Sequence, residues 1–434
     1  MVKMHTLHKF AGISSGVFLL ILAISGFVLD HDYWRSFYKQ VHTTDQVLLE
    51  KEKRLFNAIA IKNDHVVVGA MQGVFEKDKD HSFSKTFSGI TTKVFPYKES
   101  FLLVTDDGIY KKINTKWIPY GLQGHILTTA SLYNDTLIAV EEKKIILIYD
   151  LKEKKLIKKT TIDLPELELQ EDIKLSRFIR DLHYGRGIFE NSISLLLNDY
   201  ATLVLIFLSL SGYFIWYRIH QRKSGKLIRK LIKLHSNVFI LFASIFLMIL
   251  AITGIFLDHS KAFAPFLKST TVPSSFLPPV YHSLKEDIWS IDYDGERYRI
   301  GNRFGVYGSD DLKCWELENR GFAYRFVRKN DTLYISGMGA PNRILKDSTY
   351  TIYKYSPHMF KDIFKVDGIT YFLTSTTQCY LPELNSISLY TLFLSLHDGS
   401  FFASWWIWIN DFAAVMLIIL IISGTYRWWH KKRR

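Results

Sequence analysis

The chain has 434 residues, of which 48% are hydrophobic and 22% charged, and its formal net charge is +13. This composition excludes a disordered or collagen-like chain, and the two cysteines, Cys314 and Cys379, exclude a disulfide-dense scaffold and a four-cysteine zinc site. The basic charge is typical either of a nucleic-acid partner or of a membrane protein with basic flanks.

Four long apolar stretches predict membrane spans, because crossing the hydrocarbon core takes about 20 apolar residues. They are residues 13–29, 201–217, 238–257 and 412–424, the last with aromatic flanks. The first also fits a cleaved signal peptide, but the third has nearly the same pattern in mid-chain, which favours two real spans.

Fourteen of the 55 basic residues lie in three acid-free stretches beside these runs, 1–12, 216–235 and 425–434. The rest of the chain is close to neutral. The charge is therefore a topology signal, and the positive-inside rule places both termini and the middle loop in the cytoplasm. We expect a multi-pass protein of the bacterial inner membrane with two large periplasmic domains and the lipid bilayer, not nucleic acid, as its partner.

The order helix, ectodomain, helix occurs twice along the chain. We expect a four-helix transmembrane bundle from two tandem repeats, with β-rich, propeller-like extracytoplasmic domains. The expected segments are a first span in 1–32, an ectodomain in 33–180, a second span with its Leu-His-x-Gly entry in 181–219, a basic cytoplasmic loop in 220–233, a third span in 234–260, an ectodomain in 261–394, a fourth span with the same entry in 395–430 and a basic tail in 431–434.

Both ectodomains carry turn signals followed by short β-branched or aromatic runs, such as Asn134-Asp135 and Asn330-Asp331. About three such units of roughly 40 residues occur in each, a spacing typical of propeller blades. One composite propeller and two separate β domains are both compatible with this pattern.

Histidines gather at the ends of the spans, where ionisable groups are costly and mark function. The duplication relates three pairs: His8 and His235 at the cytoplasmic ends, His31 and His259 at the outer ends, and His183 and His397 in the Leu-His-x-Gly motifs. Two neutral imidazoles that face each other across a bundle can supply both axial ligands of a b-type haem. A pair near each face predicts two haems, while a single histidine at a helix end is more often an interface anchor.

Several other residues have the spacing expected around a haem. Gly12, Gly185 and Gly399 lie close to a histidine and could make room for the flat macrocycle, and Arg186 could meet a propionate. Other repeated residues are interpreted as structural: Asn198-Asp199 and Asn410-Asp411 as interhelical hydrogen-bonding pairs, and Gly26, Gly212, Gly254 and Gly424 as sites of close helix packing.

These motifs resemble the PepSY-associated transmembrane family. The resemblance rests on Leu182-His183-Tyr184-Gly185, Leu396-His397-Asp398-Gly399, His8-Lys9-Phe10-Ala11-Gly12, Leu234-His235 and the pairs Ser25-Gly26, Ser211-Gly212 and Ser423-Gly424. It covers the four spans and their approaches, about a third of the chain. Members include siderophore-iron reductases of the bacterial inner membrane, which have four spans, hold two b-type haems through histidines and reduce ferric iron in the periplasm.

The resemblance and the symmetry together imply haem iron held by His8 with His235 near the cytoplasm, and by His183 with His397 near the periplasm. A rival arrangement pairs His31 and His259 each with one of the two outer histidines. We expect electrons to pass from a quinol or a cytoplasmic donor to a ferric siderophore or another periplasmic acceptor. The alternative is a non-enzymatic sensor or assembly protein whose propeller binds a protein partner.

Overall fold

The computed structural model describes residues 4–78, 82–162, 171–185, 187–189, 191–222, 225–282, 287–377 and 380–432. The chain divides into two compact units, each assembled from segments far apart in sequence. The helical unit consists of 1–37, 171–281 and 390–434, and the β unit consists of 38–170 and 282–389.

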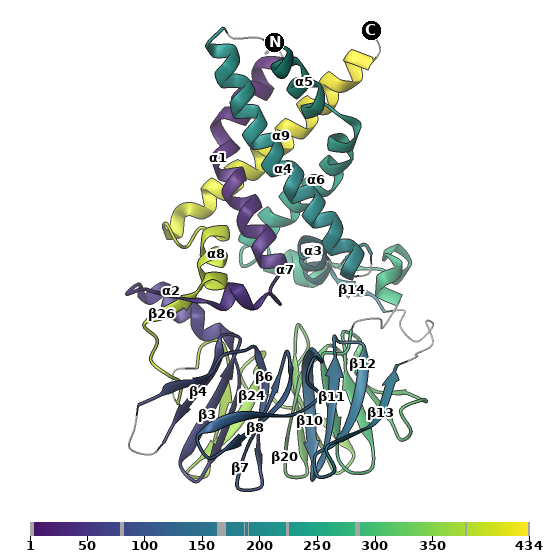
Figure 1. Cartoon of the computed structure of the whole chain (residues 1–434). Helices are drawn as coiled ribbons and strands as arrows, with labels where there is room; N and C mark the ends of the chain where they lie inside the picture. Colours follow the sequence, from purple (N-terminus) through teal and green to yellow (C-terminus); the bar gives the residue numbers. More distant parts are fainter. Residues whose placement is uncertain are drawn as a thin grey trace. The chain divides into compact units, whose positions relative to one another are not determined.

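The helical unit contains four helices that are long and apolar enough to cross a membrane, which confirms the predicted spans. They are α1 (Met4–Asp30), α4 (Asn191–His220), α6 (Val238–Asp258) and α9 (Ile407–Lys432) (Figure 1). Exposed apolar side chains such as Val17, Leu203 and Phe239 cover the outside of these helices, as expected for a surface that faces lipid.

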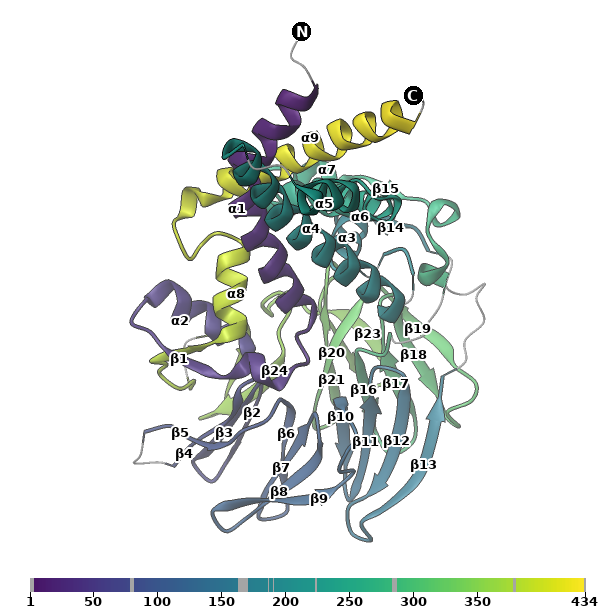
Figure 2. The ribbon, with the colours of Figure 1, turned by 45° about the horizontal axis from the view of Figure 1, so that its top comes forward.

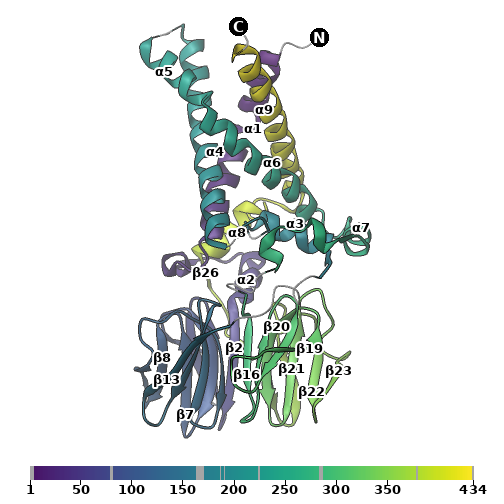
Figure 3. The same ribbon diagram turned by 90° about the vertical axis from the view of Figure 1, so that its right-hand side faces the viewer.

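Shorter elements lie at the two ends of the bundle. The chain termini and α5 (Lys226–His235) are at one end, while α3 (Leu175–His183) and α7 (Ala264–Ser269) are at the other (Figures 1 and 3). The stretch expected as a basic loop thus contains most of a helix. A short pair of strands, β14 (Ile173–Lys174) and β15 (Thr271–Val272), and the helix α8 (Leu389–His397) complete the elements around this unit.

All four long helices place the same two residue types, alanine and leucine, in the core of the bundle. α1 and α6 each contact both α4 and α9. Each helix contributes one buried alanine and one buried leucine to a common cluster: Ala23, Ala201, Ala251, Ala413, Leu19, Leu205, Leu247 and Leu417. Small alanine side chains let the helices approach closely. The sequence duplication therefore appears in the structure as a two-fold repeated packing layer.

In the described part of the chain, six antiparallel sheets make up most of the β unit, three from each chain segment, and one further two-stranded sheet links the segments. The first three contain β2 (Phe56–Lys62), β3 (His65–Ala70), β4 (Gly73–Lys77) and β5 (Ser84–Phe87); β6 (Thr91–Tyr97), β7 (Ser100–Thr105), β8 (Gly108–Ile113) and β9 (Lys116–Gly121); and β10 (Leu127–Tyr133), β11 (Thr136–Glu141), β12 (Ile145–Asp150) and β13 (Lys155–Thr161). The other three contain β16 (Ser290–Tyr293), β17 (Tyr298–Gly301), β18 (Gly305–Ser309) and β19 (Glu316–Arg320); β20 (Ala323–Lys329), β21 (Thr332–Gly337), β22 (Arg343–Lys346) and β23 (Thr349–Ile352); and β24 (Asp362–Val366) and β25 (Ile369–Leu373).

These sheets form one composite six-bladed propeller, so the propeller-like fold is confirmed and the question of one domain or two is answered (Figures 1 and 2). The first strands of the blades, β2, β6, β10, β16, β20 and β24, contact one another in this order, and β24 returns to contact β2. A second link between the segments is the pairing of β1 (Gln40–His42) with β26 (Ser386–Ser388), beside α2 (Gln46–Glu52).

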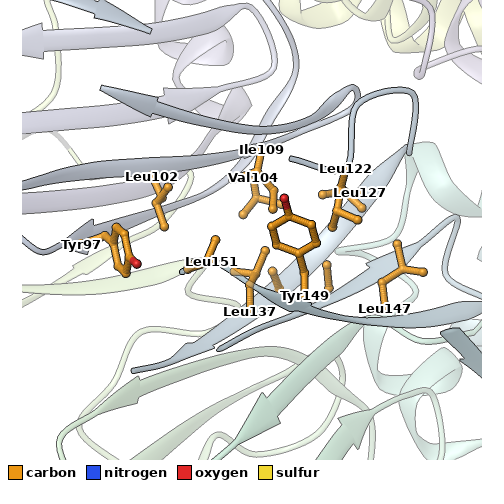
Figure 4. Packing of buried hydrophobic residues seen from close by; sticks show 12 residues of the cluster. Tyr97, Leu102, Val104, Ile109, Leu122, Leu127, Leu137, Leu147, Tyr149 and Leu151 are labelled. Carbon is orange, nitrogen blue, oxygen red and sulfur yellow. The ribbon is translucent and has the colours of Figure 1, made fainter. Parts of the chain in front are cut away.

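Local sequence and packing both favour the blades. Asn63, Asp64, Asn134 and Asn330 have positive φ angles in two-residue turns between strands, a backbone that asparagine and aspartate tolerate well. Between blades, apolar side chains from neighbouring sheets interlock, as Figure 4 shows for the second and third blades around Tyr149. The hydrophobic core of the propeller therefore lies between neighbouring blades, and the first strand of each blade lies nearest the propeller axis.

Candidate functional site

The two outer histidines end short helices of the helical unit and face each other. His183 is the last residue of α3, His397 is the last residue of α8, and their ring centres are 6.3 Å apart. Gly185 and Gly399 follow with φ of +63° and +78°, where an added Cβ would come within 2.5 Å of Asn198 and 2.4 Å of Trp406. The Leu-His-x-Gly motif is thus a helix-ending motif that needs its glycine and presents its histidine at the end.

Each outer ring is fixed by a hydroxyl group of a long helix. His183 Nδ1 lies 3.0 Å from Thr253 Oγ1, and His397 Nδ1 lies 2.9 Å from Ser25 Oγ. Thr253 and Ser25 occupy equivalent places in α6 and α1. The same histidine–hydroxyl contact therefore occurs once in each of the two repeats.

The inner pair has the same arrangement at the other end of the bundle. His8 Nδ1 lies 2.8 Å from Ser423 Oγ of α9, and His235 Nδ1 lies 2.8 Å from Ser211 Oγ of α4. Arg427, on α9, interacts electrostatically with both rings. The inner pair therefore has a positive charge nearby, a feature that the sequence pattern did not reveal.

The hydroxyl groups determine which ring nitrogen carries the proton. Ser25 Oγ donates to Ile21 O over 2.7 Å, and Thr253 Oγ1 donates to Ile249 O over 2.7 Å. Ser211 and Ser423 likewise donate to carbonyl groups of their own helices. Because each hydroxyl proton is used in this way, the hydroxyl oxygen accepts from Nδ1–H of its histidine. Nε2 then keeps its lone pair, the form in which a histidine binds a metal while its other nitrogen is held in place.

A glycine lies against every one of these rings. An added Cβ at Gly26 or Gly254 would be 3.4 Å from Cε1 of His397 or His183, and at Gly424 or Gly212 it would be 3.5 Å or 3.7 Å from Cε1 of His8 or His235. The role predicted for these glycines was close helix packing alone. In the structure, each hydroxyl–glycine pair holds one imidazole: the first residue bonds Nδ1 and the second leaves room for the ring.

The inner and outer pairs are separated by most of a membrane thickness. Ser25 is 17 positions after His8 in α1, which at a rise of about 1.5 Å per residue gives about 25 Å. The hydrocarbon core of a bilayer is about 30 Å thick. One pair therefore belongs to each half of the bundle.

The structure gives His31 and His259 different neighbours. His31 Nδ1 contacts Phe27 O at 2.8 Å and its Nε2 lies 3.5 Å from Asp199 Oδ2, while His259 Nε2 lies 2.6 Å from Asp411 Oδ2. Both rings thus lie beside the carboxylates of the repeated Asn-Asp pairs, and no ring contact with another histidine occurs among the described residues.

The remaining candidate residues lie apart from the rings or outside the described residues. An added Cβ at Gly12 would be in ordinary contact, 3.6 Å from Leu420. Asn410 donates to His397 O and Asn198 to Asp30, the interhelical bonding expected of them. Arg186 and Cys379 fall outside the described residues, and Cys314 is an exposed free thiol.

The donor set suits a haem better than a bare metal ion. Within the described ranges, no group of three or more His, Cys, Asp or Glu residues could hold a metal ion. Two imidazole rings lie near each other in the outer part of the bundle, with His183 and His397 ring centres 6.3 Å apart, and would be the residues to hold a haem. The residues present therefore fit a group that supplies its own equatorial ligands and needs two axial ones.

Comparison with known proteins identifies similarity at two levels. The family model of the PepSY-associated TM region matches residues 150–431, which contain His183, His235 and His397. No curated protein matches the chain.

Similar solved structures include a protein of unknown function from Bacteroides thetaiotaomicron, which is 10% identical over 74% of this chain and 66% of that chain, with a TM-score of 0.37. PorZ, a surface component of the type-IX secretion system of Porphyromonas gingivalis, is 10% identical over 74% and 36%, with a TM-score of 0.33. The Pan2 WD40 domain of Neurospora crassa is 6% identical over 76% and 88%, with a TM-score of 0.32.

Proposed function

Because the chain belongs to the PepSY-associated TM family, we propose that it is a membrane oxidoreductase that holds two b-type haems and passes electrons across the bilayer to ferric iron on a chelate. The observation that carries this proposal is the fourfold repeated contact of a histidine Nδ1 with a hydroxyl group that precedes a glycine. A ligand histidine needs Nε2 unprotonated and its ring held in place, and a hydrogen bond at Nδ1 provides both.

His183 and His397 would hold the outer haem, and His8 and His235 the inner one. A bound b-type haem supplies reversible one-electron chemistry. The hydroxyl groups keep the four rings in the ligating tautomer, and Arg427 offers a positive charge for a propionate at the inner site. Between the two sites, the layer of alanine and leucine side chains excludes water and keeps the dielectric low.

We infer the orientation of the protein in the membrane from its charge distribution. Both termini and α5 lie at one end of the bundle and carry the basic stretches, so we assign that end to the cytoplasm and the propeller to the periplasm. The electron donor would be a quinol or a cytoplasmic reductant. Each electron converts one ferric ion to ferrous, and hard oxygen ligands hold the ferrous ion less tightly, so reduction releases the iron from its chelate.

The visible spectrum of the protein purified in detergent tests the proposal. We expect the absorption of a reducible low-spin b-type haem, with two haems per chain. A protein without this absorption would contradict the proposal and favour the alternative of a sensor or assembly protein with structural histidines.

Single substitutions test the pairing. His183→Ala and His397→Ala should each remove the same one of the two haems, and His8→Ala the other. His220→Ala is a matched control, because His220 stacks on Trp216 at the end of α4 away from the proposed pairs. If His31→Ala lowers haem content and His397→Ala does not, the rival pairing is correct.

A further inference from the structure

The short helix α5 lies between two membrane spans and stays close to the bilayer surface. It contacts α4, and only residues 221–225 and 236–237 separate it from the end of α4 and the start of α6. The ends of membrane spans lie near the lipid headgroups. Since both of its connections are short, α5 is held at the level of the headgroups, at the end of the bundle that contains the chain termini (Figures 1 and 3).

The basic residues of α5 share one side of the helix. They follow the spacing i, i+3, i+4 and i+7 and form what we call the basic face: Lys226, Arg229, Lys230 and Lys233. All four side chains are exposed, and none of them forms an ion pair among the described residues. Another side of α5 faces the bundle, where Ile228 is 3% exposed and His235 contacts Ser211 of α4. The basic face therefore points away from the protein.

No carboxylate of the spans lies near enough to neutralise this charge. The chain contains no acidic residue between Asp199 and Asp258. Asp199 is 21 positions before the last residue of α4 and Asp258 is 20 positions after the first residue of α6, about 30 Å along each helix. The neighbouring ends of α1 and α9 are also free of acidic residues, before Asp30 and after Asp411. Because charges in salt solution are screened over about 10 Å, the basic face remains available to an anion.

Exposed apolar side chains lie beside the basic face. Leu227 and Leu234 are 63% and 47% exposed, and at about 100° per residue both project about 100° from the centre of the basic face. A helix with basic residues on one face and leucines beside them is typical of segments that lie in the interface between membrane and water. This combination favours an amphiphile, with an anionic head for the basic face and an acyl chain for the two leucines, over an anion that is polar throughout.

We propose that α5 binds anionic phospholipids, with their headgroups at the basic face and their acyl chains against Leu227 and Leu234. This contact differs from that of the spans with lipid, which is apolar and does not select for charge. A basic residue beside an anionic lipid surface contributes about fivefold to affinity. The basic face should therefore prefer anionic to zwitterionic lipid by about tenfold or more. The inference concerns the helical unit alone and does not depend on the proposed electron transfer.

Native mass spectrometry of the full-length protein in a neutral detergent tests the proposal. The protein is titrated with phosphatidylglycerol or with phosphatidylcholine, and the dissociation constant of each bound lipid is measured. We expect phosphatidylglycerol to bind about tenfold more tightly or better. Glutamine has nearly the helix propensity of lysine and arginine, so the fourfold variant Lys226→Gln/Arg229→Gln/Lys230→Gln/Lys233→Gln should keep α5 and lose most of this preference.

A matched control removes the same charge elsewhere. Lys116→Gln/Lys155→Gln/Lys313→Gln/Lys354→Gln changes four exposed lysines of the β unit and should leave the affinity for phosphatidylglycerol within about twofold of the unmodified protein. The conservative variant Lys226→Arg/Lys230→Arg/Lys233→Arg keeps the charge and should also retain the preference. Leu227→Gln/Leu234→Gln should weaken the binding of phosphatidylglycerol, because the acyl chains lose their contact.

Three results would overturn the proposal: equal affinity for the two lipids, a preference that survives in the fourfold glutamine variant of α5, or full displacement of phosphatidylglycerol by inorganic phosphate, which would indicate a site for a free anion. If the fourfold variant fails to fold, Lys230→Gln decides. It should weaken phosphatidylglycerol binding about fivefold, and an unchanged affinity would contradict the proposal. These affinities are measured without reduction, so a failure here is distinct from a failure of the proposed haem chemistry.

Discussion

Replacing Thr253 by valine removes the hydroxyl that holds His183 and changes little else in the shape of α6. The Nδ1–H group of His183 then loses the acceptor that lies 3.0 Å away. A buried donor left without its partner costs about 1–3 kcal/mol. We therefore expect haem affinity to fall about tenfold, which corresponds to the lower part of that range.

The assay is the haem-to-protein ratio during dilution or competition with a haem-binding acceptor, together with a redox titration of the two haems. Only the haem held by His183 should weaken. Ser244→Ala is the matched control, since Ser244 is on the same helix and donates only to Ile240 O of that helix. If Thr253→Val keeps both haems with unchanged affinity and unchanged potentials, the hydroxyl groups do not position the ligands and our reasoning about the tautomer is wrong.

Three further predictions follow from packing and charge. Gly26→Ala should be tolerated because its Cβ would be 3.4 Å from the ring of His397, whereas Gly26→Val should cost about 1–3 kcal/mol and lower haem content, as measured by thermal unfolding and haem assay. Asp292→Ala should lower stability by about 3 kcal/mol in urea unfolding, because it removes the carboxylate that accepts from two nitrogens of the part-buried Arg328 guanidinium and leaves only that of Asp294, at 3.7 Å. Burial lowers the pKa of Lys93 to about 8, so above pH 8 the folded chain has lost a proton that the unfolded chain keeps. The free energy of unfolding should therefore rise by up to about 1.4 kcal/mol per pH unit between pH 8 and pH 10. The unmodified protein should show this rise relative to Lys93→Met, and parallel stability curves for the two proteins would contradict the prediction.

The sequence predicted the spans well because a membrane imposes a simple condition on composition. An apolar run of sufficient length with basic flanks leaves few alternatives, and all four predicted stretches lie within helices that could span a bilayer. The number of propeller domains could not be predicted in this way. It depends on whether β24 contacts β2. This contact includes the hydrogen bond from Ile59 N–H to Asp362, two residues that are 303 positions apart.

The candidate site was visible in part. Histidines at matching positions stood out because ionisable residues are rare beside membrane spans. The pairs Ser25-Gly26 and Ser423-Gly424 were equally visible as repeats, but a small residue before a glycine also promotes plain helix packing. Their contacts with His397 and His8 depend on how helices from different parts of the chain pack, which no local pattern encodes. Arg427 was missed for the same reason.

The composite propeller imposes an order on how the protein can fold. Its first three blades are complete when the ribosome has made residue 161, but β2 then has no neighbour on its open side until β24 is made, about 200 residues later. Two spans of the bundle are synthesised during that interval. The half-formed propeller therefore exposes apolar sheet faces while the membrane helices insert, and such long-range closure is slow. We expect slow maturation and a need for chaperones that shield the first three blades until the chain's second half arrives.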